Sequence, residues 1–310
     1  MRIGTDPEFF LTDPKGNLVS AIPVIQGTKQ QQFEVEGGGL QHDNVAAEFS
    51  CDPSDSEEAF VTTIGKMLKQ LAHYVEPLVV NAIQSADFPK AELESQEAQA
   101  FGCDPDFDAY DVAINTFDAS AAASSLRSCG GHIHVGVKNG HPKVLANGDM
   151  SADGDPIAFG KIRLVKAMDL FLGVSSLLMD SDPAAARRRE LYGKAGCHRP
   201  KDYGVEYRTL SNFWTKSPDM VRLIYRLTVL SAMACDTNYD KECFSSIGSG
   251  DPSIGEAIVR KTIDNSNVER AKEIVSNFVL PRLKKETLAL YNKAIKNGSG
   301  TLYDEWGIKS

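Results

Sequence analysis

The alternation of apolar and polar residues predicts strands near the beginning of the chain. Apolar and aromatic residues dominate 2–11, and the turn-like segment 13–17 separates this stretch from an extended pattern at 18–24. This arrangement predicts a β-hairpin. Three further short stretches are expected to form strands: 45–49, 133–137 and 203–209.

Apolar residues spaced three and four positions apart predict helices in most of the remaining chain. They recur in this way from Phe60 to Leu78, where Ser54 and Glu57 form a capping pair in front and Pro77 is expected to bend or end the helix. The polar, glycine-containing segment 139–160 is expected to be a long loop excursion. Further helices are expected at 162–179, 218–235, 254–264 and 267–296.

These elements predict an α+β fold, because strands and helices do not alternate regularly as they do in a parallel βαβ array. We expect a mainly antiparallel sheet covered by helices. The chain has 310 residues, 42% of them apolar, which is enough for a sizeable core. We therefore expect one domain over 1–310, with a helical C-terminal part at 217–300.

The charge balance narrows the classes of partner. The chain carries 33 basic and 42 acidic residues, for a net charge of -9, which argues against direct nucleic-acid binding and against binding to a membrane surface. No apolar run approaches the roughly 20 residues needed to span a bilayer. The first residues contain no apolar signal core. We expect a cytoplasmic protein.

The cysteines are scattered, with no closely spaced pair, so we interpret them as buried or idle thiols of a reducing compartment. A nucleophilic Cys129 near His132 is an alternative, although proximity along the chain is weak support for a nucleophile–base pair. The six cysteines are Cys51, Cys103, Cys129, Cys197, Cys235 and Cys243.

Three polar motifs carry pairs of ionisable residues separated by one position. Residues i and i+2 of a strand point to the same face, so each pair projects from one face while Pro7, Ile133 or Tyr207 faces the other. If these strands share a sheet, the crowded charges would repel one another without cations, which predicts bound metal. The pairs are Asp6 with Glu8, His132 with His134, and Glu206 with Arg208, and Glu48 adds a further carboxylate.

Each motif alone has a simpler interpretation as a solvated sheet face or a cross-strand salt bridge. The glycines Gly130, Gly131 and Gly136 around the histidines favour a site, since glycine lets a backbone or ligand approach closely. A ligand set rich in carboxylates suits Mg²⁺ or Mn²⁺, and Zn²⁺ remains an alternative.

A basic cluster precedes the third motif and could bind anionic substrates such as phosphates or carboxylates. The segment 192–196 within it has the composition of a flexible loop, and a solvated turn is the alternative interpretation. The chain contains no P-loop motif. The basic residues are Arg187, Arg188, Arg189, Lys194, Arg199 and Lys201.

Two of these motifs are similar to sequences of known ligases. Gly4-Thr5-Asp6-Pro7-Glu8-Phe9-Phe10-Leu11 resembles the first metal-binding strand of glutamine synthetases, and Gly130-Gly131-His132-Ile133-His134-Val135-Gly136 resembles their histidine strand. The chain most resembles the type 2 carboxylate–amine ligases (amidoligases), a family common in phage genomes within the glutamine-synthetase and glutamate–cysteine-ligase superfamily. The segments 43–49, 101–107, 191–196 and 212–214 share this resemblance.

The resemblance implies a curved sheet of the glutamine-synthetase catalytic-domain type, with ATP and two or more Mg²⁺ or Mn²⁺ ions as cofactors. It implies that Asp6, His132 and Glu206 hold one ion, and that Glu8, Glu48 and Glu36 hold another. Arg208, Arg199 and Arg189 would meet phosphate and the substrate carboxylate, with Lys194 beside the nucleotide. Glu48 and His134 are the candidates for the group that accepts the amine proton.

The expected activity is ATP-driven joining of a small-molecule or peptide carboxylate to an amine through an acyl phosphate. Two alternatives stay open at this point. One is a metal-dependent hydrolase that uses the histidines and carboxylates to activate water. The other is a non-enzymatic phage protein with a metal-stabilised sheet.

Overall fold

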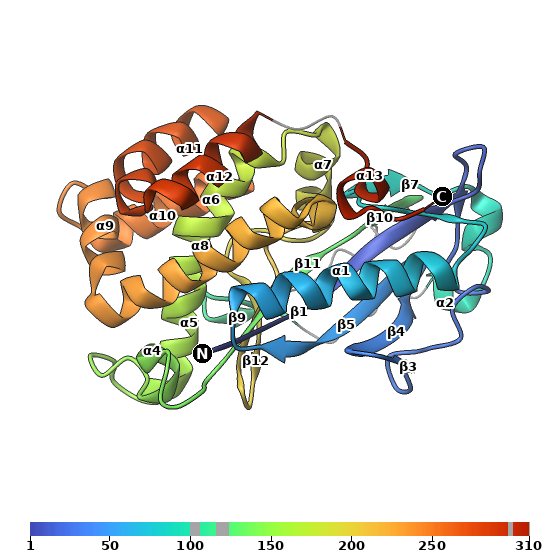
Figure 1. Ribbon diagram of the computed structural model, residues 1–310. Coiled ribbons are helices and arrows are strands. Elements are labelled where there is room, and N and C mark those ends of the chain that lie inside the picture. The colour runs from blue at the N-terminus through green and yellow to red at the C-terminus, as the bar shows by residue number, and fades with distance from the viewer. Residues whose placement is uncertain (100–105, 116–123, 297–299, 310) are drawn as a thin grey trace.

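The computed structural model describes residues 1–99, 106–115, 124–296 and 300–309, which form a large antiparallel sheet and a body of helices (Figure 1). The sheet has eleven strands among these residues, in the order β3-β4-β5-β1-β11-β13-β12-β8-β9, and β2 and β6 also pair with β1. Its central strands are β4 (Gly38–Asp43), β5 (Ala46–Ser54), β1 (Arg2–Thr12), β11 (Gly131–Gly136), β13 (Gly204–Tyr207) and β12 (Cys197–Lys201). The expected mainly antiparallel sheet with helices is confirmed.

Shorter strands complete the sheet and form one separate ribbon. β2 pairs with the end of β1, which confirms the expected hairpin, although residues beyond Val19 turn away rather than continue the strand. The short strands are β2 (Leu18–Val19), β3 (Phe33–Val35), β6 (Val79–Asn81), β8 (Phe107–Asp108) and β9 (Ala113–Ile114), and β7 (Ser85–Asp87) pairs with β10 (Leu126–Ser128).

The strand register brings the three polar motifs together on neighbouring strands. Asp6 of β1 lies opposite His132 of β11, and His134 of β11 lies opposite Glu206 of β13. On the other side of β1, Glu8 lies opposite Glu48 of β5. The prediction that the motifs share one sheet is confirmed.

The helices cover one face of the sheet. In Figure 1, α1 (Glu57–Tyr74) lies along β1, β4 and β5, and most of the other helices gather beside it. These are α5 (Pro156–Met168), α6 (Val174–Met179), α8 (Pro218–Thr237), α9 (Tyr239–Ile247), α10 (Pro252–Asp264), α11 (Val268–Ile274) and α12 (Lys285–Ile295). The remaining helices among the described residues are α2 (Gln96–Gln99), α4 (Lys143–Ala146), α7 (Pro183–Leu191) and α13 (Leu302–Trp306). None of the helices among the described residues combines the length and the apolar character that crossing a membrane requires.

The main core lies between the sheet and the helices. Ile3, Phe9, Ile133 and Tyr207 are at most 1% exposed and belong to it. Because side chains alternate along a strand, the residues between them point to the opposite face. The acidic residues of β1 therefore lie on the face of the sheet opposite the main core.

Two helix boundaries differ from the predictions for local reasons. Ser56, not Ser54, caps α1, because its side chain accepts a hydrogen bond from the Ala59 N–H while Ser54 still belongs to β5. α5 begins at Pro156, inside the segment expected to be a loop, because Asp155 caps it and proline suits the first helical turn.

The long C-terminal helix predicted at 267–296 is broken. A π-helical turn, Val275–Val279, follows α11, and a short 3₁₀ turn at Leu280–Arg282 then separates it from α12. Pro281 lies in this break, where the missing N–H of proline and its ring do not allow an α-helix to continue.

Candidate active site

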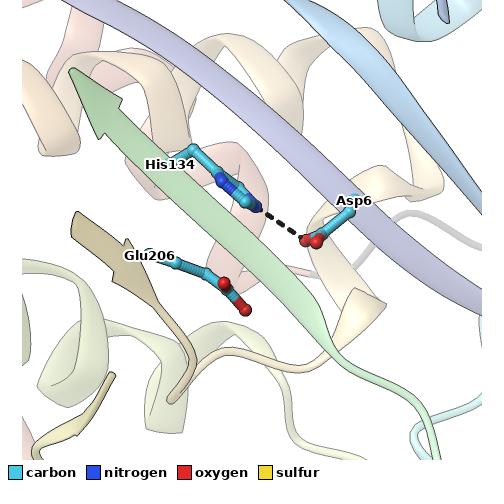
Figure 2. Close-up of side chains that lie close together, drawn as sticks. All are labelled: Asp6, His134 and Glu206. Carbon is cyan, nitrogen blue, oxygen red and sulfur yellow. Dashed lines mark ion pairs between the residues drawn. The ribbon is translucent and has the colours of Figure 1, made fainter. Parts of the chain in front are cut away.

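Three polar side chains from three adjacent strands converge on the face of the sheet opposite the main core. Asp6 of β1, His134 of β11 and Glu206 of β13 each offer a ligand atom, and these atoms lie within 4.8 Å of one another. Figure 2 shows Asp6 and His134 directed towards each other, with Nε2 of the imidazole 3.0 Å from Oδ1 of the carboxylate. We call these three residues the histidine cluster.

His132 lies directly beside the histidine cluster. Its Nδ1 is 3.2 Å from Oδ1 of Asp6 and 3.8 Å from Oε1 of Glu206. Burial, together with the charge of Arg208, lowers the pKa of His132 to about 3, so the imidazole is neutral and can act as a metal ligand. Gly130 makes room for this ring, since a Cβ there would lie 2.2 Å from Nε2 of His132.

A second group of carboxylates lies along β1 from the first. Glu8, Asp43 and Glu48 also offer oxygen atoms within 4.8 Å of one another, and we call them the carboxylate cluster. The Gly130 N–H donates to Oε2 of Glu8 at 2.6 Å, and the Gln41 amide donates to Oε2 of Glu48 at 2.8 Å. Glu8 and Glu48 are only 8% and 5% exposed, so water screens their repulsion poorly.

The carboxylate cluster is electrostatically strained in the absence of a cation. Burial, reinforced by Asp43, raises the pKa of Glu8 to about 7, and burial with the neighbouring carboxylates raises that of Glu48 well above its usual value. Burial also opposes ionisation of Asp6, but His134 and His132 outweigh it and hold the pKa of Asp6 well below its usual value. A bound cation would relieve the repulsion between the carboxylates.

Three basic side chains converge on Glu206, which is 1% exposed. Nζ of Lys201 is 2.9 Å from one carboxylate oxygen, and Nη1 of Arg199 is 3.4 Å from the other. Arg208 also donates to this second oxygen, and its guanidinium lies 4.9 Å from the ring centre of Tyr192. The histidine cluster therefore has a basic edge with several N–H donors.

The structure places three of the expected site residues away from both clusters. Glu36 is 81% exposed and pairs with Lys66. Lys194 is exposed on the loop after α7. Arg189 donates to the Ala185 carbonyl and to Ser266 Oγ, within a separate cavity described below. The resemblance motif at 101–105 lies outside the described residues.

The basic run does not lie in a turn. Residues 187–189 belong to α7, and the helix directs neighbouring side chains in different directions. Arg187 pairs with Asp87, whereas Arg188 is buried and donates to the carbonyls of Thr209 and Leu210. The three consecutive arginines, Arg187, Arg188 and Arg189, therefore lie in three different environments.

The structure also disfavours a nucleophilic Cys129. This side chain is fully buried, and burial raises the pKa of its thiol well above the ordinary value. A thiolate, which is the reactive form, is therefore scarce at neutral pH.

Sequence reasoning did not single out Asp43 or Tyr203. Asp43 ends β4 and Ala46 begins β5 opposite it, so a tight turn at Asn44, whose φ is positive, brings Asp43 beside Glu48. The turn-forming pair Asp43-Asn44 directly before the strand predicted at 45–49 could have indicated that Asp43 lies near Glu48. Tyr203 lies on the β12–β13 hairpin with its hydroxyl 2.5 Å from Nδ1 of His134, a contact that only the strand register reveals.

The donor atoms suit hard divalent cations. The carboxylate cluster offers oxygen atoms alone, and the histidine cluster offers two carboxylates and an imidazole. Mg²⁺ and Mn²⁺ prefer such oxygen-rich sets, whereas thiolates, the ligands typical of structural zinc sites, are absent from both described clusters.

One comparison with known proteins found a match in the part of the chain that supplies the basic edge of the histidine cluster. Residues 156–247, fewer than a third of the chain, match the family described as phage phiEco32-like COOH.NH2 ligase-type 2. This segment includes β12 and β13, and with them Arg199, Glu206 and Arg208. No curated protein matched the chain. The family that the motifs resemble, the type 2 carboxylate–amine ligases, is thus the family that the chain matches over residues 156–247.

Proposed function

We propose that this protein is an ATP-dependent ligase that joins a carboxylate to an amine through an acyl phosphate. The observation that carries the proposal is the placement of two metal-compatible clusters on one sheet face, with three basic side chains at the edge formed by Glu206. The family match over the strands that supply Glu206 and Arg208 supports the same activity.

Two divalent cations fit this arrangement. Asp6, His134 and Glu206, with His132 beside them, would hold one, and Glu8, Asp43 and Glu48 would hold the other. Such ions neutralise phosphate charge and polarise the phosphoryl group. Because Asp6 and Glu8 are two positions apart on β1, the two sites adjoin each other along one strand.

The basic residues at Glu206 would bind the anionic substrates. In the structure, Arg199, Lys201 and Arg208 all direct N–H donors at the Glu206 carboxylate. Once a cation shares that carboxylate, these donors can turn to phosphate oxygens or to the substrate carboxylate. Arginine suits this role because its planar fork can contact two oxygen atoms at once.

The reaction balances as two transfers. A carboxylate oxygen attacks the γ-phosphorus of ATP and ADP leaves, and the amine nitrogen then attacks the acyl carbon and phosphate leaves with that oxygen. The amine must lose a proton, and Glu48 and His134 are the candidates to accept it; His134 can do so only where His132 replaces it as the imidazole ligand of the first cation. Burial opposes protonation of His134, but Asp6 raises its pKa, so the ring can hold a proton beside the carboxylate.

Several broader features belong to the same proposal. The chain would form a single catalytic domain with the curved sheet of glutamine synthetases, which the motifs on β1 and β11 and the antiparallel topology support. A phage origin and a place in the host cytoplasm, where ATP is available, agree with the name of the matched family. The substrates would be a small-molecule or peptide carboxylate and an amine.

A paired substrate screen tests the proposal. The protein is incubated with MgATP and with libraries of carboxylates and amines, and condensation products are identified by mass spectrometry. We expect ADP release that requires both a carboxylate and an amine. Turnover of an amide or ester without ATP would instead identify a metal-dependent hydrolase.

Substitutions in the two clusters test whether the ligase activity depends on them. Glu206→Gln and Glu48→Gln should abolish ligation because each removes a carboxylate ligand from one cluster. Glu36→Gln is the matched control, since this exposed carboxylate pairs with Lys66 away from both clusters. Equal losses in all three variants would contradict the assignment.

A further inference from the structure

A cavity lies outside the two acidic clusters. Its volume is about 360 Å³, within the range of small-molecule sites, and it lies between the end of α6, the start of α7 and residues at the beginning of α11. These helices lie near one another in the upper part of Figure 1, with α12 beside them. No described residue that lines the cavity belongs to the histidine or carboxylate cluster.

Arg189 places a buried positive charge in the cavity wall. Its side chain is 7% exposed, and Nη1 donates to the Ala185 carbonyl at 3.2 Å and to Ser266 Oγ at 3.1 Å. Its Nε has no hydrogen-bond partner among the described residues, and none of them forms an ion pair with it. Burial lowers the pKa of Arg189 to about 10, which leaves the guanidinium charged at neutral pH. The nearby Asp180 carboxylate favours the charged form, but no described acid lies within ion-pair distance of the guanidinium.

The acidic residue best placed to neutralise Arg189 already accepts hydrogen bonds from other residues. Asp180 also lines the cavity, but one of its oxygens accepts from the Gln84 amide at 3.0 Å and the other from Ser211 Oγ at 2.7 Å. Leu177, Pro183 and Val268 contribute apolar wall. Two other charged residues line the cavity, but Asp182 accepts from the Ala184 N–H and Lys272 pairs with Glu269. The cavity thus combines apolar surface with one buried arginine that no described acid contacts directly.

We propose that this cavity is a second binding site, for a small carboxylate with a short apolar body. The carboxylate would accept hydrogen bonds from Arg189, and the apolar body would pack against Leu177 and Val268. An amide of the same shape satisfies the donors less well, because it lacks the negative charge.

A titration with hexanoate and its neutral counterpart hexanamide tests the proposal without any ligase assay. Binding to the full-length protein is measured by calorimetry and by ligand-observed NMR. Hexanoate should bind at least about 10-fold more tightly than hexanamide, as expected for hydrogen bonds to a charged partner.

Variants locate the binding. Arg189→Met removes the charge and keeps an extended side chain, so it should abolish the preference for hexanoate. Arg187→Met is the matched control from the same helix, because Arg187 is 45% exposed and pairs with Asp87 on another surface. Ala186→Leu narrows the cavity while leaving the charge in place, and it should weaken both ligands. Circular dichroism verifies that each variant is folded.

Two results would overturn the proposal. One is equal binding of hexanoate and hexanamide to the unsubstituted protein. The other is a hexanoate preference that survives in folded Arg189→Met, or that Arg187→Met removes to the same extent. If Arg189→Met does not fold, loss of binding in Ala186→Leu supports the site and unchanged binding in that variant overturns it.

Discussion

Replacing Glu8 by glutamine should make the metal-free protein more stable and at the same time less responsive to metal. Glu8 is 8% exposed within the carboxylate cluster, and burial with the charge of Asp43 raises its pKa from 4.5 to about 7. A folded-state pKa above the unfolded value means that ionisation costs stability. This cost is absent below the unfolded pKa, grows between pH 4.5 and 7, and is complete above pH 7.

The rise in pKa sets the magnitude. Each unit by which folding raises the pKa corresponds to 1.36 kcal/mol. Removing the charge should therefore increase the free energy of unfolding by at most about 3 kcal/mol at pH 8. Glutamine keeps the shape, and its carbonyl can still accept from the Gly130 N–H, as Oε2 of Glu8 does at 2.6 Å. The gain should therefore not be lost to a cavity or an unsatisfied donor.

Denaturant unfolding with and without Mg²⁺ measures both effects. A ligand that binds only the folded state stabilises it, so Glu8→Gln should lose most of the stabilisation that Mg²⁺ gives the unsubstituted protein. Asp169→Asn is a matched control, since burial raises the pKa of Asp169 to about 7 on the helical side of the sheet. That variant should retain its response to Mg²⁺.

Either of two results for Glu8→Gln would refute this reasoning. Metal-free Glu8→Gln that is less stable than the unsubstituted protein at pH 8 would show that the charge of Glu8 is not a cost. An unchanged Mg²⁺ response would show that Glu8 does not contribute to cation binding.

Three further substitutions test other parts of the site. Arg208→Lys keeps the charge but loses the planar fork, so the ligation rate constant should fall about 10- to 1000-fold with little change in ATP affinity, and near-normal steady-state rates would limit Arg208 to a structural role. Tyr203→Phe removes the hydroxyl that lies 2.5 Å from Nδ1 of His134, so Mg²⁺ affinity measured by calorimetry should fall about tenfold, and unchanged affinity would mean that this contact does not orient the ring. Tyr207→Ala empties a fully buried position on the helical face and should cost about 3–5 kcal/mol in denaturant unfolding, whereas a loss of activity without a loss of stability would contradict the strand register.

The sequence predicted the polar face of the sheet because the evidence for it is local. Spacing by two residues places Asp6 with Glu8 on one strand face whatever the rest of the fold does. The apolar partners on the opposite face, such as Ile133 and Tyr207, are fully buried as that pattern requires. The antiparallel pairing of these strands followed from the irregular order of strands and helices.

The remaining details depend on contacts between distant segments, which no local pattern encodes. Asp43 joins Glu8 only through the pairing of β4 with β5 and β5 with β1. Arg188 and Arg189 are neighbours in sequence, yet α7 directs one to the carbonyls of Thr209 and Leu210 and the other to a separate cavity. A composition-based interpretation of the basic run could not separate them.

The fate of the carboxylate oxygen tests the central claim most directly. With a cognate amine, MgATP and a carboxylate labelled with ¹⁸O, an acyl phosphate transfers one labelled oxygen to phosphate when the amide forms. We therefore predict that inorganic phosphate carries ¹⁸O in proportion to the amide product. Product formation with unlabelled phosphate, or with the label in AMP, would contradict the proposed phosphoryl transfer.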